Sequence, residues 1–442
     1  MDAFVTDARR GYPPAAAVGG CLEGSEESGR AKTAFGGNRM RAVVMSFVCA
    51  IAFGSAAFAA TAASTTMADF ESAASAGFTV SESEAGSVKA DLAAAPGGRC
   101  LAVKFTRKEK SGTAYVYLPV TQELSRTAEA YDGISFRVKG DGSKAFGLIE
   151  IRTNDFTRIY QAVFRVDETS WKSIGIRWDE FFRIDDKGGD GPIDWKAINK
   201  FGFGSRAGWG SCSFEVDDLA LAKIAPRAKL RAAEGSERLA KTVAKLKEGK
   251  AVKIVALGDS ITFGTQVPKE MRKTGLYFQI AAAGIGKAFP KAKVTTVNAG
   301  VGGDTVAEGL VRIGHQVAAE DPDLVTVLLG ANDASYDFPD TRVRSTMSLL
   351  IDNLFETTRA EVLILGPVPA PSIPNVPERY CDVYKELAAE KNVACFDLNA
   401  AMRKLPAQKL KEAFADGVHP SEEGHRACGQ ALLEYVLGLA KD

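Results

Sequence analysis

The sequence has few histidines and no excess of charge of either sign. Three histidines occur in 442 residues, and 55 Lys and Arg residues balance 55 Asp and Glu residues. The formal net charge of zero argues against nucleic acid as a partner, because binding to a phosphate backbone needs a basic surface. Any reaction that depends on an imidazole base therefore has only three candidate side chains.

Cysteine motifs typical of metal centres are also missing. None of the seven cysteines lies in a Cys-x-x-Cys pattern or in a cluster with histidine, so no metal site of the zinc type is indicated. Five cysteines follow residue 60, and an odd number leaves at least one thiol unpaired. Cys100 and Cys212 are a candidate disulfide pair, and the alternative is that all five are small buried apolar residues.

Long hydrophobic runs are absent apart from one near the N-terminus. Residues 42–58 are mostly apolar, follow Met40 and an arginine, and end in an Ala-Phe-Ala pattern typical of signal-peptide cleavage sites. The pattern predicts a signal peptide over 40–59, with residues 1–39 as an extension ahead of the true start or a long n-region. We therefore expect a secreted or periplasmic protein with no stable membrane span after cleavage. The alternative is a buried helix or a membrane anchor, although about 17 residues are marginal for spanning a bilayer.

Residues 68–223 have the texture of an all-β domain, preceded by a linker predicted over 60–67. Short runs alternate apolar and polar residues, and clusters of Gly, Asp and Ser separate them. These runs are 100–105, 114–118, 133–138, 146–151 and 160–166. Such strands and turns predict a β-sandwich.

Residues 224–250 are a basic connector with one predicted helix. Ser236 can cap the start of this helix, and Gly249 can end it. Its apolar face would be formed by Leu239, Val243 and Leu246. We expect a helical linker between two domains.

From residue 251 to 442, apolar strands alternate with helices. The predicted strands are 253–257, 294–298, 324–329, 361–365 and 393–397. The predicted helices are 305–318, 341–359, 377–391 and 421–440. This alternation predicts a parallel sheet covered on both faces, with the functional site beyond the carboxyl ends of the strands.

A serine follows the first of these strands directly, in the motif Gly-Asp-Ser260. A hydroxyl becomes a nucleophile when a base takes its proton. His419 is the strongest candidate base, because Asp416 lies three residues upstream across a turn and can orient the ring and stabilise the imidazolium. The sequence thus predicts Ser260, His419 and Asp416 as a catalytic triad.

Acyl transfer also needs hydrogen-bond donors aimed at the oxyanion. A glycine-rich turn at 298–305 follows the second strand and can bring a backbone N–H close to a ligand. Asn332 follows the third strand and offers a side-chain amide. Asp259 and Asp333 are interpreted as acceptors that hold loops, because the triad is already filled. The two remaining histidines are interpreted as structural or solvent-facing, and they are His315 and His425.

Four blocks in this order resemble the SGNH (GDSL) hydrolase family, namely Gly-Asp-Ser260, Gly-Gly303-Asp-Thr, Gly-Ala-Asn332-Asp and Asp416-Gly-Val-His419-Pro. The resemblance implies a flavodoxin-like three-layer α/β/α fold over 251–442. The N–H groups of Ser260 and Gly303 and the amide of Asn332 would be the oxyanion donors. His419 would be the general base, and Asp416 would orient it. The resemblance implies no metal or organic cofactor for the reaction.

The β-domain over 68–223 resembles galactose-binding-like jelly-roll modules, and within them the CIA30 and family-11 carbohydrate-binding type. The resemblance rests on strand texture and on residues 131–138, 171–178 and 214–221. Such modules often hold a structural Ca²⁺, and Glu71 and Asp217 are the ligands suggested here, because hard carboxylates suit this ion.

Aromatic residues are concentrated in the β-domain, and two interpretations of them stay open. Exposed rings can stack on sugar rings, whereas buried rings would form the core of a sandwich. The residues concerned are Trp171, Trp178, Trp195, Trp209, Tyr115, Tyr117 and Tyr160.

The combined pattern predicts a secreted serine esterase that removes O-acyl groups, foremost O-acetyl groups, from a polysaccharide or oligosaccharide. One alternative is a lipase, lysophospholipase or thioesterase of the SGNH type, which would need a wide apolar acyl groove. An alternative of another class is a non-catalytic carbohydrate-binding protein.

Overall fold

The computed structural model describes residues 64–71, 77–82, 86–107, 114–185, 191–205, 211–372, 377–414 and 416–441. The predicted signal peptide at 40–59 and the segment 1–39 lie outside the described residues, as does Trp209. Among the described helices, none combines the length and the apolar character needed to cross a membrane.

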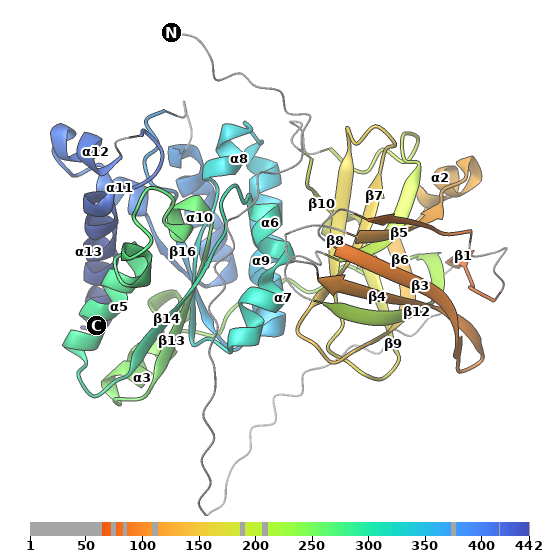
Figure 1. Ribbon diagram of the computed structural model, residues 1–442, viewed down its shortest axis with the longest axis horizontal. Helices are drawn as coiled ribbons and strands as arrows, with labels where there is room; N and C mark the ends of the chain where they lie inside the picture. Colours follow the sequence, from red (N-terminus) through yellow and green to blue (C-terminus); the bar gives the residue numbers. More distant parts are fainter. Residues whose placement is uncertain are drawn as a thin grey trace, which may run out of the picture. The chain divides into compact units, whose positions relative to one another are not determined.

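Two antiparallel sheets form the N-terminal part (Figure 1). The first sheet has the order β3 (Gly86–Ala95), β4 (Gly98–Arg107), β12 (Cys212–Ala222), β6 (Gly133–Gly140) and β9 (Lys172–Arg177), with β1 (Ser64–Ala68) also paired to β12. The second has the order β10 (Phe182–Arg183), β8 (Ile159–Arg165), β7 (Phe146–Arg152), β11 (Lys200–Ser205), β5 (Ala114–Pro119) and β2 (Thr79–Glu82). Short helical turns lie between strands, namely α2 (Gln122–Ala128) and η1 (Trp178–Glu180). The predicted β-sandwich is confirmed.

Phenylalanine rings fill the space between the two sheets. Phe136 and Phe214 come from the first sheet, whereas Phe164 and Phe203 come from the second. The Phe164 and Phe214 rings meet edge to face, with centroids 5.1 Å apart. Alternation along each strand brings these rings to one side, which is why the period of two in the sequence marked the strands.

The aromatic residues singled out in the sequence are mostly buried. Trp195 is 3% exposed and lies in the sandwich core, and Trp178 packs against its ring. Tyr115, Tyr117 and Tyr160 are also buried. Trp171 is half-buried beneath the guanidinium of Arg137. For these residues, the interpretation as packing residues is the one that the structure supports.

Two details of the N-terminal part differ from the sequence predictions. The linker predicted at 60–67 is wrong for its second half, because β1 begins at Ser64 and pairs with β12. The candidate disulfide is also wrong, because all five described cysteines are free and Cys212 lies opposite Phe105 rather than Cys100. Most of these thiols are buried, as the alternative interpretation held.

The connector contains a short helix that starts later than predicted. A 3-10 turn, η2 (Ser236–Arg238), precedes α3 (Ala240–Lys247). Leu239 adopts a left-handed conformation with φ of 53° between them, so Ser236 does not cap α3. Val243 and Leu246 are buried on one face as predicted, and Gly249, with φ of 72°, follows the helix end.

The C-terminal part is a three-layer α/β/α fold with a parallel sheet. Its strand order is β14 (Val294–Gly300), β13 (Val252–Gly258), β15 (Leu324–Leu328), β16 (Glu361–Leu365) and β17 (Ala394–Phe396). In chain order this is 2-1-3-4-5, the flavodoxin-like order, whose switch point lies beside the first strand. The predicted fold class is confirmed.

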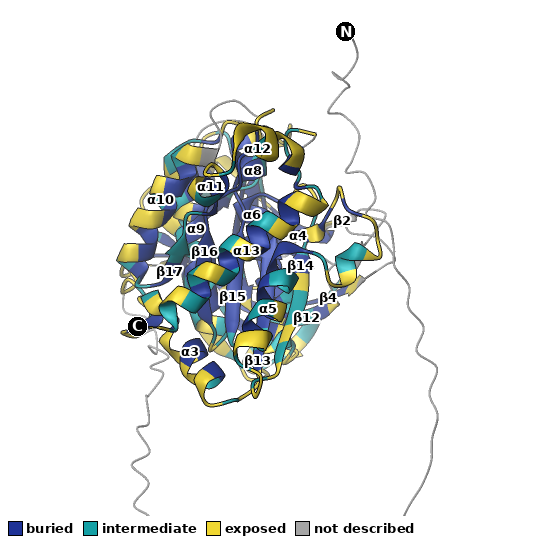
Figure 2. Ribbon diagram, turned by 90° about the vertical axis from the view of Figure 1, so that its left-hand side faces the viewer, coloured by how far each residue is buried: buried dark blue, intermediate teal, exposed yellow. Residues whose placement is uncertain are grey.

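Helices cover both faces of this sheet (Figure 2). One face packs on α3, α5 (Tyr277–Ala288), α11 (Leu398–Met402), α12 (Ala407–Ala413) and α13 (Glu422–Leu439). The other packs on α6 (Val306–Val311), α7 (Ile313–Gln316), α9 (Asp340–Thr357) and α10 (Pro377–Lys391). Shorter segments are α4 (Ser260–Phe263), η3 (Met271–Lys273), η4 (Ala318–Glu320) and α8 (Ala331–Ser335).

The sandwich and the helical layer share one apolar cluster, and residues 61–442 form one compact unit. Strand β7 explains how, because its alternate residues point to opposite sides. Ile149 and Ile151 face the sandwich core, whereas Phe146 and Leu148 pack with the helices of the C-terminal part.

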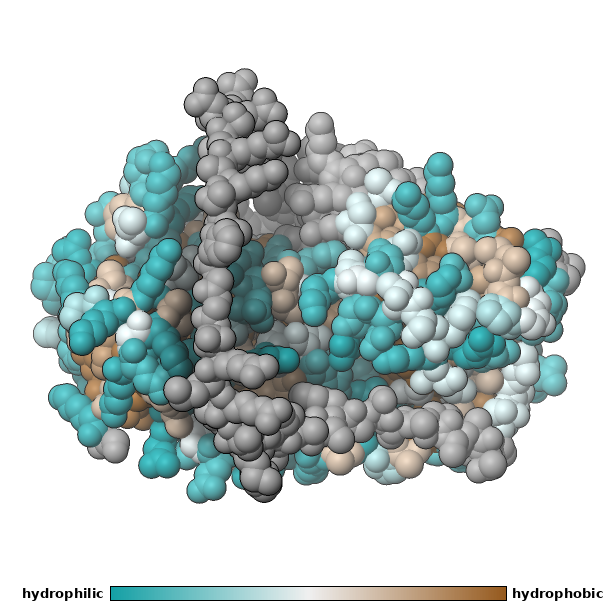
Figure 3. All heavy atoms as spheres, turned by 90° about the horizontal axis from the view of Figure 1, so that it is seen from below, coloured by the Kyte–Doolittle hydropathy of each residue, from teal (hydrophilic) through white to brown (hydrophobic). Residues whose placement is uncertain are grey.

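Hydrophilic side chains predominate on the face in Figure 3, and hydrophobic ones form small separate areas.

Candidate active site

Ser260 stands where β13 ends and α4 begins, at the carboxyl edge of the sheet. The preceding residue, Asp259, caps this helical turn by accepting a hydrogen bond from the Ile261 N–H at 2.9 Å. Ser260 is half-buried, while Asp259 and Ile261 are buried. A buried cap therefore fixes the turn that presents the serine hydroxyl.

His419 and Asp416 lie beside this serine, on the loop before α13. The His419 Nε2 atom is 2.9 Å from the Ser260 Oγ atom, and its Nδ1 atom is 2.7 Å from Asp416 Oδ2. The other carboxylate oxygen, Oδ1, accepts hydrogen bonds from the N–H groups of Val418 and His419 at 2.8 and 2.7 Å. One carboxylate therefore orients both the loop backbone and the imidazole ring.

The surroundings of Asp416 keep its carboxyl ionised. Burial raises its pKa, but hydrogen bonds from Val418 N–H and from His419 outweigh burial and lower the pKa to about 2. Gln266 adds a further donor, with its Nε2 atom 2.8 Å from Asp416 Oδ2. Sequence reasoning missed Gln266, which lies 150 residues away in the loop after α4.

Two of the three predicted oxyanion donors lie outside the Ser260 turn, Gly303 in the loop after β14 and Asn332 in α8. Gly303 has φ of 87°, and the space that its Cβ would occupy has no atom within 4 Å. The adjacent Gly302 lies against Ser260, since a Cβ on it would be 3.9 Å from the serine Cβ. Asn332, at the start of α8, donates from Nδ2 to the Asp304 carbonyl at 2.8 Å. That bond ties the Asn332 amide to the loop that carries Gly303.

Arg312 is a fully buried guanidinium beneath these loops, and sequence reasoning missed it. Its Nη2 atom donates to the Gly258 carbonyl at 2.7 Å, and Nη1 donates to the Ala299 carbonyl. Its Nε atom pairs with the carboxylate of Asp304. One side chain thus joins the ends of β13 and β14 to the loop that carries Gly303 and Asp304.

Asp259 and Asp333 hold backbone groups, as expected of loop acceptors. Asp333 accepts from the Val306 N–H at 3.1 Å, which fixes the start of α6. Burial is the main cause that raises the pKa of each carboxyl to about 7, and the neighbouring Asp304 contributes to the raised pKa of Asp259.

The two remaining histidines lie on helices and not on the loop that bears Asp416 and His419. His315 lies in α7. His425 is 1% exposed, and its Nδ1 atom accepts from the Tyr277 N–H at 3.3 Å. Burial lowers the pKa of His425 to about 4, so this ring is neutral at physiological pH.

The suggested calcium ligands already have protein partners. Glu71 accepts from the Arg99 N–H at 3.2 Å, and Asp217 pairs with Arg137 at 3.5 Å. In the described ranges, no three His, Cys, Asp or Glu side chains group together as metal ligands would. The calcium site stays a prediction.

Two family models match the two parts of this fold. The GDSL-like Lipase/Acylhydrolase family matches residues 256–427, and the Complex I intermediate-associated protein 30 (CIA30) family matches residues 70–217. An arylesterase of Vibrio mimicus is 31% identical over 189 residues, which are 42% of this chain and 88% of that protein. An acetylxylan esterase of Geobacillus stearothermophilus is 28% identical over 214 residues, 43% of this chain and 96% of that protein.

Solved structures give a weaker likeness. A two-domain esterase active on acetylated mannans has a TM-score of 0.38 and 21% identity, over 47% of this chain and 54% of that one. This chain thus spans about half the length of that esterase. The chain belongs to the GDSL-like lipase/acylhydrolase family of carboxylic ester hydrolases, and a CIA30 domain precedes its hydrolase domain.

Proposed function

We propose that this protein is an exported serine esterase that removes O-acetyl groups from a carbohydrate through Ser260, His419 and Asp416. The observation that carries the proposal is the continuous hydrogen-bond chain from the Ser260 hydroxyl through both His419 ring nitrogens to the Asp416 carboxylate. Such a chain allows the ring to take the hydroxyl proton at Nε2 while Nδ1–H stays on the carboxylate.

The reaction follows from this order of atoms. His419 Nε2 takes the proton from Ser260 Oγ as the oxygen attacks the ester carbonyl carbon. The imidazolium then gives that proton to the departing sugar hydroxyl, which leaves an acetyl group on Ser260. Water attacks this acyl-enzyme in the same way, with His419 as base, and acetate is released. The ionised carboxylate of Asp416 stabilises the imidazolium in both halves.

Three proposed donors stabilise the negative charge of the tetrahedral intermediate. They are the N–H groups of Ser260 and Gly303 and the amide of Asn332. The open space at Gly303 supports this assignment, because an incoming oxygen needs room beside the N–H that binds it. Asn332 uses one amide hydrogen on the Asp304 carbonyl, and an amide has two. The second hydrogen is available for the oxyanion.

A carbohydrate ester as the substrate is supported by two kinds of observation. One relative is an acetylxylan esterase, and the matched region spans 96% of it. The second observation is the CIA30 domain in the same chain, whose sequence resembles carbohydrate-binding jelly rolls. A longer acyl group is the competing possibility, because another relative is a thioesterase and lysophospholipase of Escherichia coli that is 26% identical over 133 residues.

Acetate release from acetylated xylan, mannan, pectin and peptidoglycan tests the substrate. We expect release from at least one polysaccharide, and a loss of at least 10³-fold in kcat when Ser260 is changed to Ala. Ser345→Ala is the matched control, since this α9 hydroxyl only bonds the Arg342 carbonyl. Full activity in Ser260→Ala would contradict the triad. Faster turnover of p-nitrophenyl octanoate than of p-nitrophenyl acetate would contradict the acetyl specificity.

Export by residues 40–59 is part of the proposal and is tested separately. We expect the protein produced in a bacterial host to appear outside the cytoplasm, with a new N-terminus just after the Ala-Phe-Ala pattern at 57–59. N-terminal sequencing identifies the cleavage point. Retention of residues 40–59 in the mature protein would contradict the signal peptide.

A further inference from the structure

Large hydrophobic side chains that are well exposed are few among the described residues. They are Val80, Phe156, Phe263 and Tyr336. The last two belong to the hydrolase domain, and both are aromatic, with 36% and 47% of their surface exposed. An exposed aromatic ring forgoes the gain from burial and keeps an apolar face free to contact a ligand.

Both rings lie one helical turn beyond a residue of the proposed site. Phe263 is three residues after Ser260 on α4, and its N–H donates to the Asp259 carbonyl at 2.9 Å. Tyr336 follows α8, and its N–H donates to the Asn332 carbonyl at 3.0 Å. Residues three or four apart on a helix share a face, with Cβ atoms about 5–6 Å apart. By this spacing the Cβ atom of Phe263 lies near that of Ser260, and the Cβ atom of Tyr336 lies near that of Asn332.

Phe263 is braced from one side by an arginine. The Arg272 guanidinium carbon lies 4.6 Å from the centroid of the Phe263 ring. Arg272 is itself held, because its Nε atom donates to the Val267 carbonyl at 3.2 Å. This contact fixes the ring in place while a third of its surface stays in solvent.

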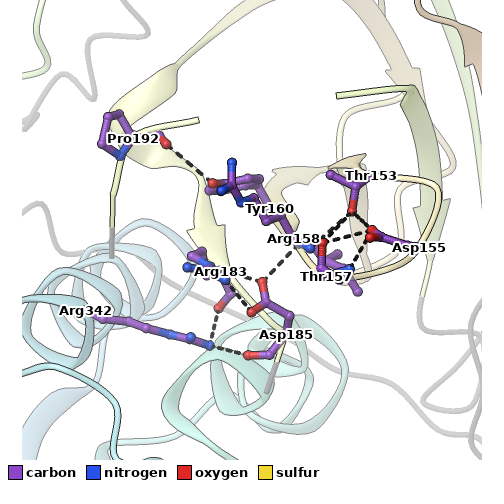
Figure 4. A network of polar contacts seen from close by, with 10 residues as sticks. Thr153, Asp155, Thr157, Arg158, Tyr160, Arg183, Asp185, Pro192 and Arg342 are labelled. Atoms are coloured by element: carbon purple, nitrogen blue, oxygen red, sulfur yellow. Dashed lines mark hydrogen bonds and ion pairs between the residues drawn. The ribbon is translucent and has the colours of Figure 1, made fainter. Parts of the chain in front are cut away.

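Tyr336 is braced by a stack that reaches into the protein. Its ring is stacked on Phe338 with centroids 5.4 Å apart and planes 20° apart. Phe338 is 2% exposed, and the Arg342 guanidinium carbon lies 3.4 Å from its centroid. Arg342 donates to the carbonyls of Arg183 and Asp185 at 3.2 and 2.9 Å (Figure 4). The exposed Tyr336 ring is thus the outermost member of a stack that continues through Phe338 to Arg342.

We propose that Phe263 and Tyr336 are sugar-stacking residues that select an oligosaccharide over a small ester. The flat C–H face of a pyranose packs on an aromatic face, and two rigid rings beside one ester position would engage the acetylated sugar and a linked one. Rings that neighbouring side chains already hold in place lose little conformational freedom when a sugar binds. This favours a role in substrate specificity. The inference rests on the proposed function, since it assumes a carbohydrate ester at Ser260.

Paired substrates test this inference on the full-length protein. We compare Phe263→Ala, Tyr336→Ala and the double variant on acetylated xylotetraose and on p-nitrophenyl acetate. For each single variant, kcat/KM on the oligosaccharide should fall about tenfold, mainly through KM, and at least fivefold more than on the aryl ester. Tyr336→Phe should restore the activity, because it keeps the ring. Phe156→Ala, which removes a still more exposed ring of the sandwich, is the control.

The outcomes separate the two proposals. Equal losses on both substrates, or no loss on the oligosaccharide, overturn the stacking role and leave the esterase function standing. A wild-type protein that cleaves p-nitrophenyl acetate but no acetylated oligosaccharide overturns both the carbohydrate substrate and the stacking role. If Tyr336→Phe lacks the activity that Tyr336→Ala loses, the hydroxyl rather than the ring is responsible. That result overturns the stacking role of Tyr336.

Discussion

Asp333 is a carboxyl group buried next to the proposed oxyanion donor Asn332. It accepts from the Val306 N–H, and burial raises its pKa to about 7 although Arg342 partly offsets this. A carboxyl whose folded pKa lies above its unfolded value of about 3.9 binds its proton more tightly in the folded state. The group therefore costs stability progressively as pH rises from about 4 to about 7, and the full cost remains above that.

We expect Asp333→Asn to stabilise the protein at pH 8 and to have about a third of that effect at pH 5. The Asn oxygen still accepts from Val306, and no charge has to be buried. The gain should be on the order of 4 kcal/mol in the free energy of unfolding at pH 8, because the folded pKa of about 7 exceeds the unfolded value by about 3. Urea titrations at both pH values measure it, with the exposed Asp337→Asn as control. A gain of the same size at pH 5 would contradict the explanation.

The residues predicted for the site are those that local motifs mark. Ser260 follows a strand, and Asp416 and His419 share one turn, so their chemistry is visible within a few residues. Gln266 and Arg312 act through contacts with residues 150 and 54 positions away. A polar side chain in a loop or between two helices shows no local sign that it will meet a residue far along the chain. Such residues could not be predicted before the fold was known.

The loop before α13 is the element that carries two members of the proposed triad. Gly417, between Asp416 and His419, has φ of 81°, and a Cβ on it would lie 1.7 Å from the Ser372 Oγ atom. The Ser372 N–H in turn donates to the Gly417 carbonyl at 2.9 Å. The turn is thus held against Ser372 by a backbone hydrogen bond.

We expect Gly417→Ala to reduce kcat on p-nitrophenyl acetate by about 10- to 100-fold, because the added methyl displaces the turn that aligns His419. The left-handed conformation should also cost about 1–2 kcal/mol of stability. Steady-state kinetics and thermal unfolding measure the two effects. Gly438→Ala near the end of α13 is the control, since a Cβ there meets no atom within 4 Å. Unchanged kcat in Gly417→Ala would contradict the role of this turn.

Elements were predicted well where one period of hydrophobicity dominates. All five parallel strands and the long helices α9, α10 and α13 lie within a few residues of their predicted positions. The connector was harder, because Leu239 was placed on a helix face and instead adopts a left-handed conformation that packs its side chain fully inside. Strand β1 was missed because Ser64–Ala68 is short and only its pairing with β12 makes it a strand.

At the scale of the whole molecule, the sandwich covers a helical face of the hydrolase domain. Phe146, Leu148 and Phe182 of the sandwich join the cluster formed by α6, α7 and α9. Helix α6, which follows the loop that carries Gly303, therefore has part of its packing supplied by the sandwich. No pattern within either half of the sequence predicts this contact. The apolar residues on the second side of a strand such as β7 could equally belong to the core of the sandwich itself.

Gly314 on α7 lies at this contact, directly against the backbone of the sandwich. A Cβ at Gly314 would lie 2.0 Å from the Lys144 carbonyl oxygen of the sandwich, and a backbone atom has little freedom to yield. Gly314→Ala should therefore separate the two parts locally and destabilise the molecule by about 1–3 kcal/mol. Gly286→Ala on α5 is the matched control, because a Cβ there meets no atom within 4 Å.

Two probes follow the parts separately in one urea titration. All four tryptophans of the chain lie between residues 171 and 209, so tryptophan fluorescence reports on the sandwich, whereas hydrolysis of p-nitrophenyl acetate reports on the hydrolase domain. We expect the two transitions to coincide in the wild-type protein and in Gly286→Ala, because shared packing makes their unfolding cooperative. In Gly314→Ala, activity should be lost at a lower urea concentration than fluorescence changes. Coincident transitions in that variant would mean that the contact does not couple the sandwich to the esterase site.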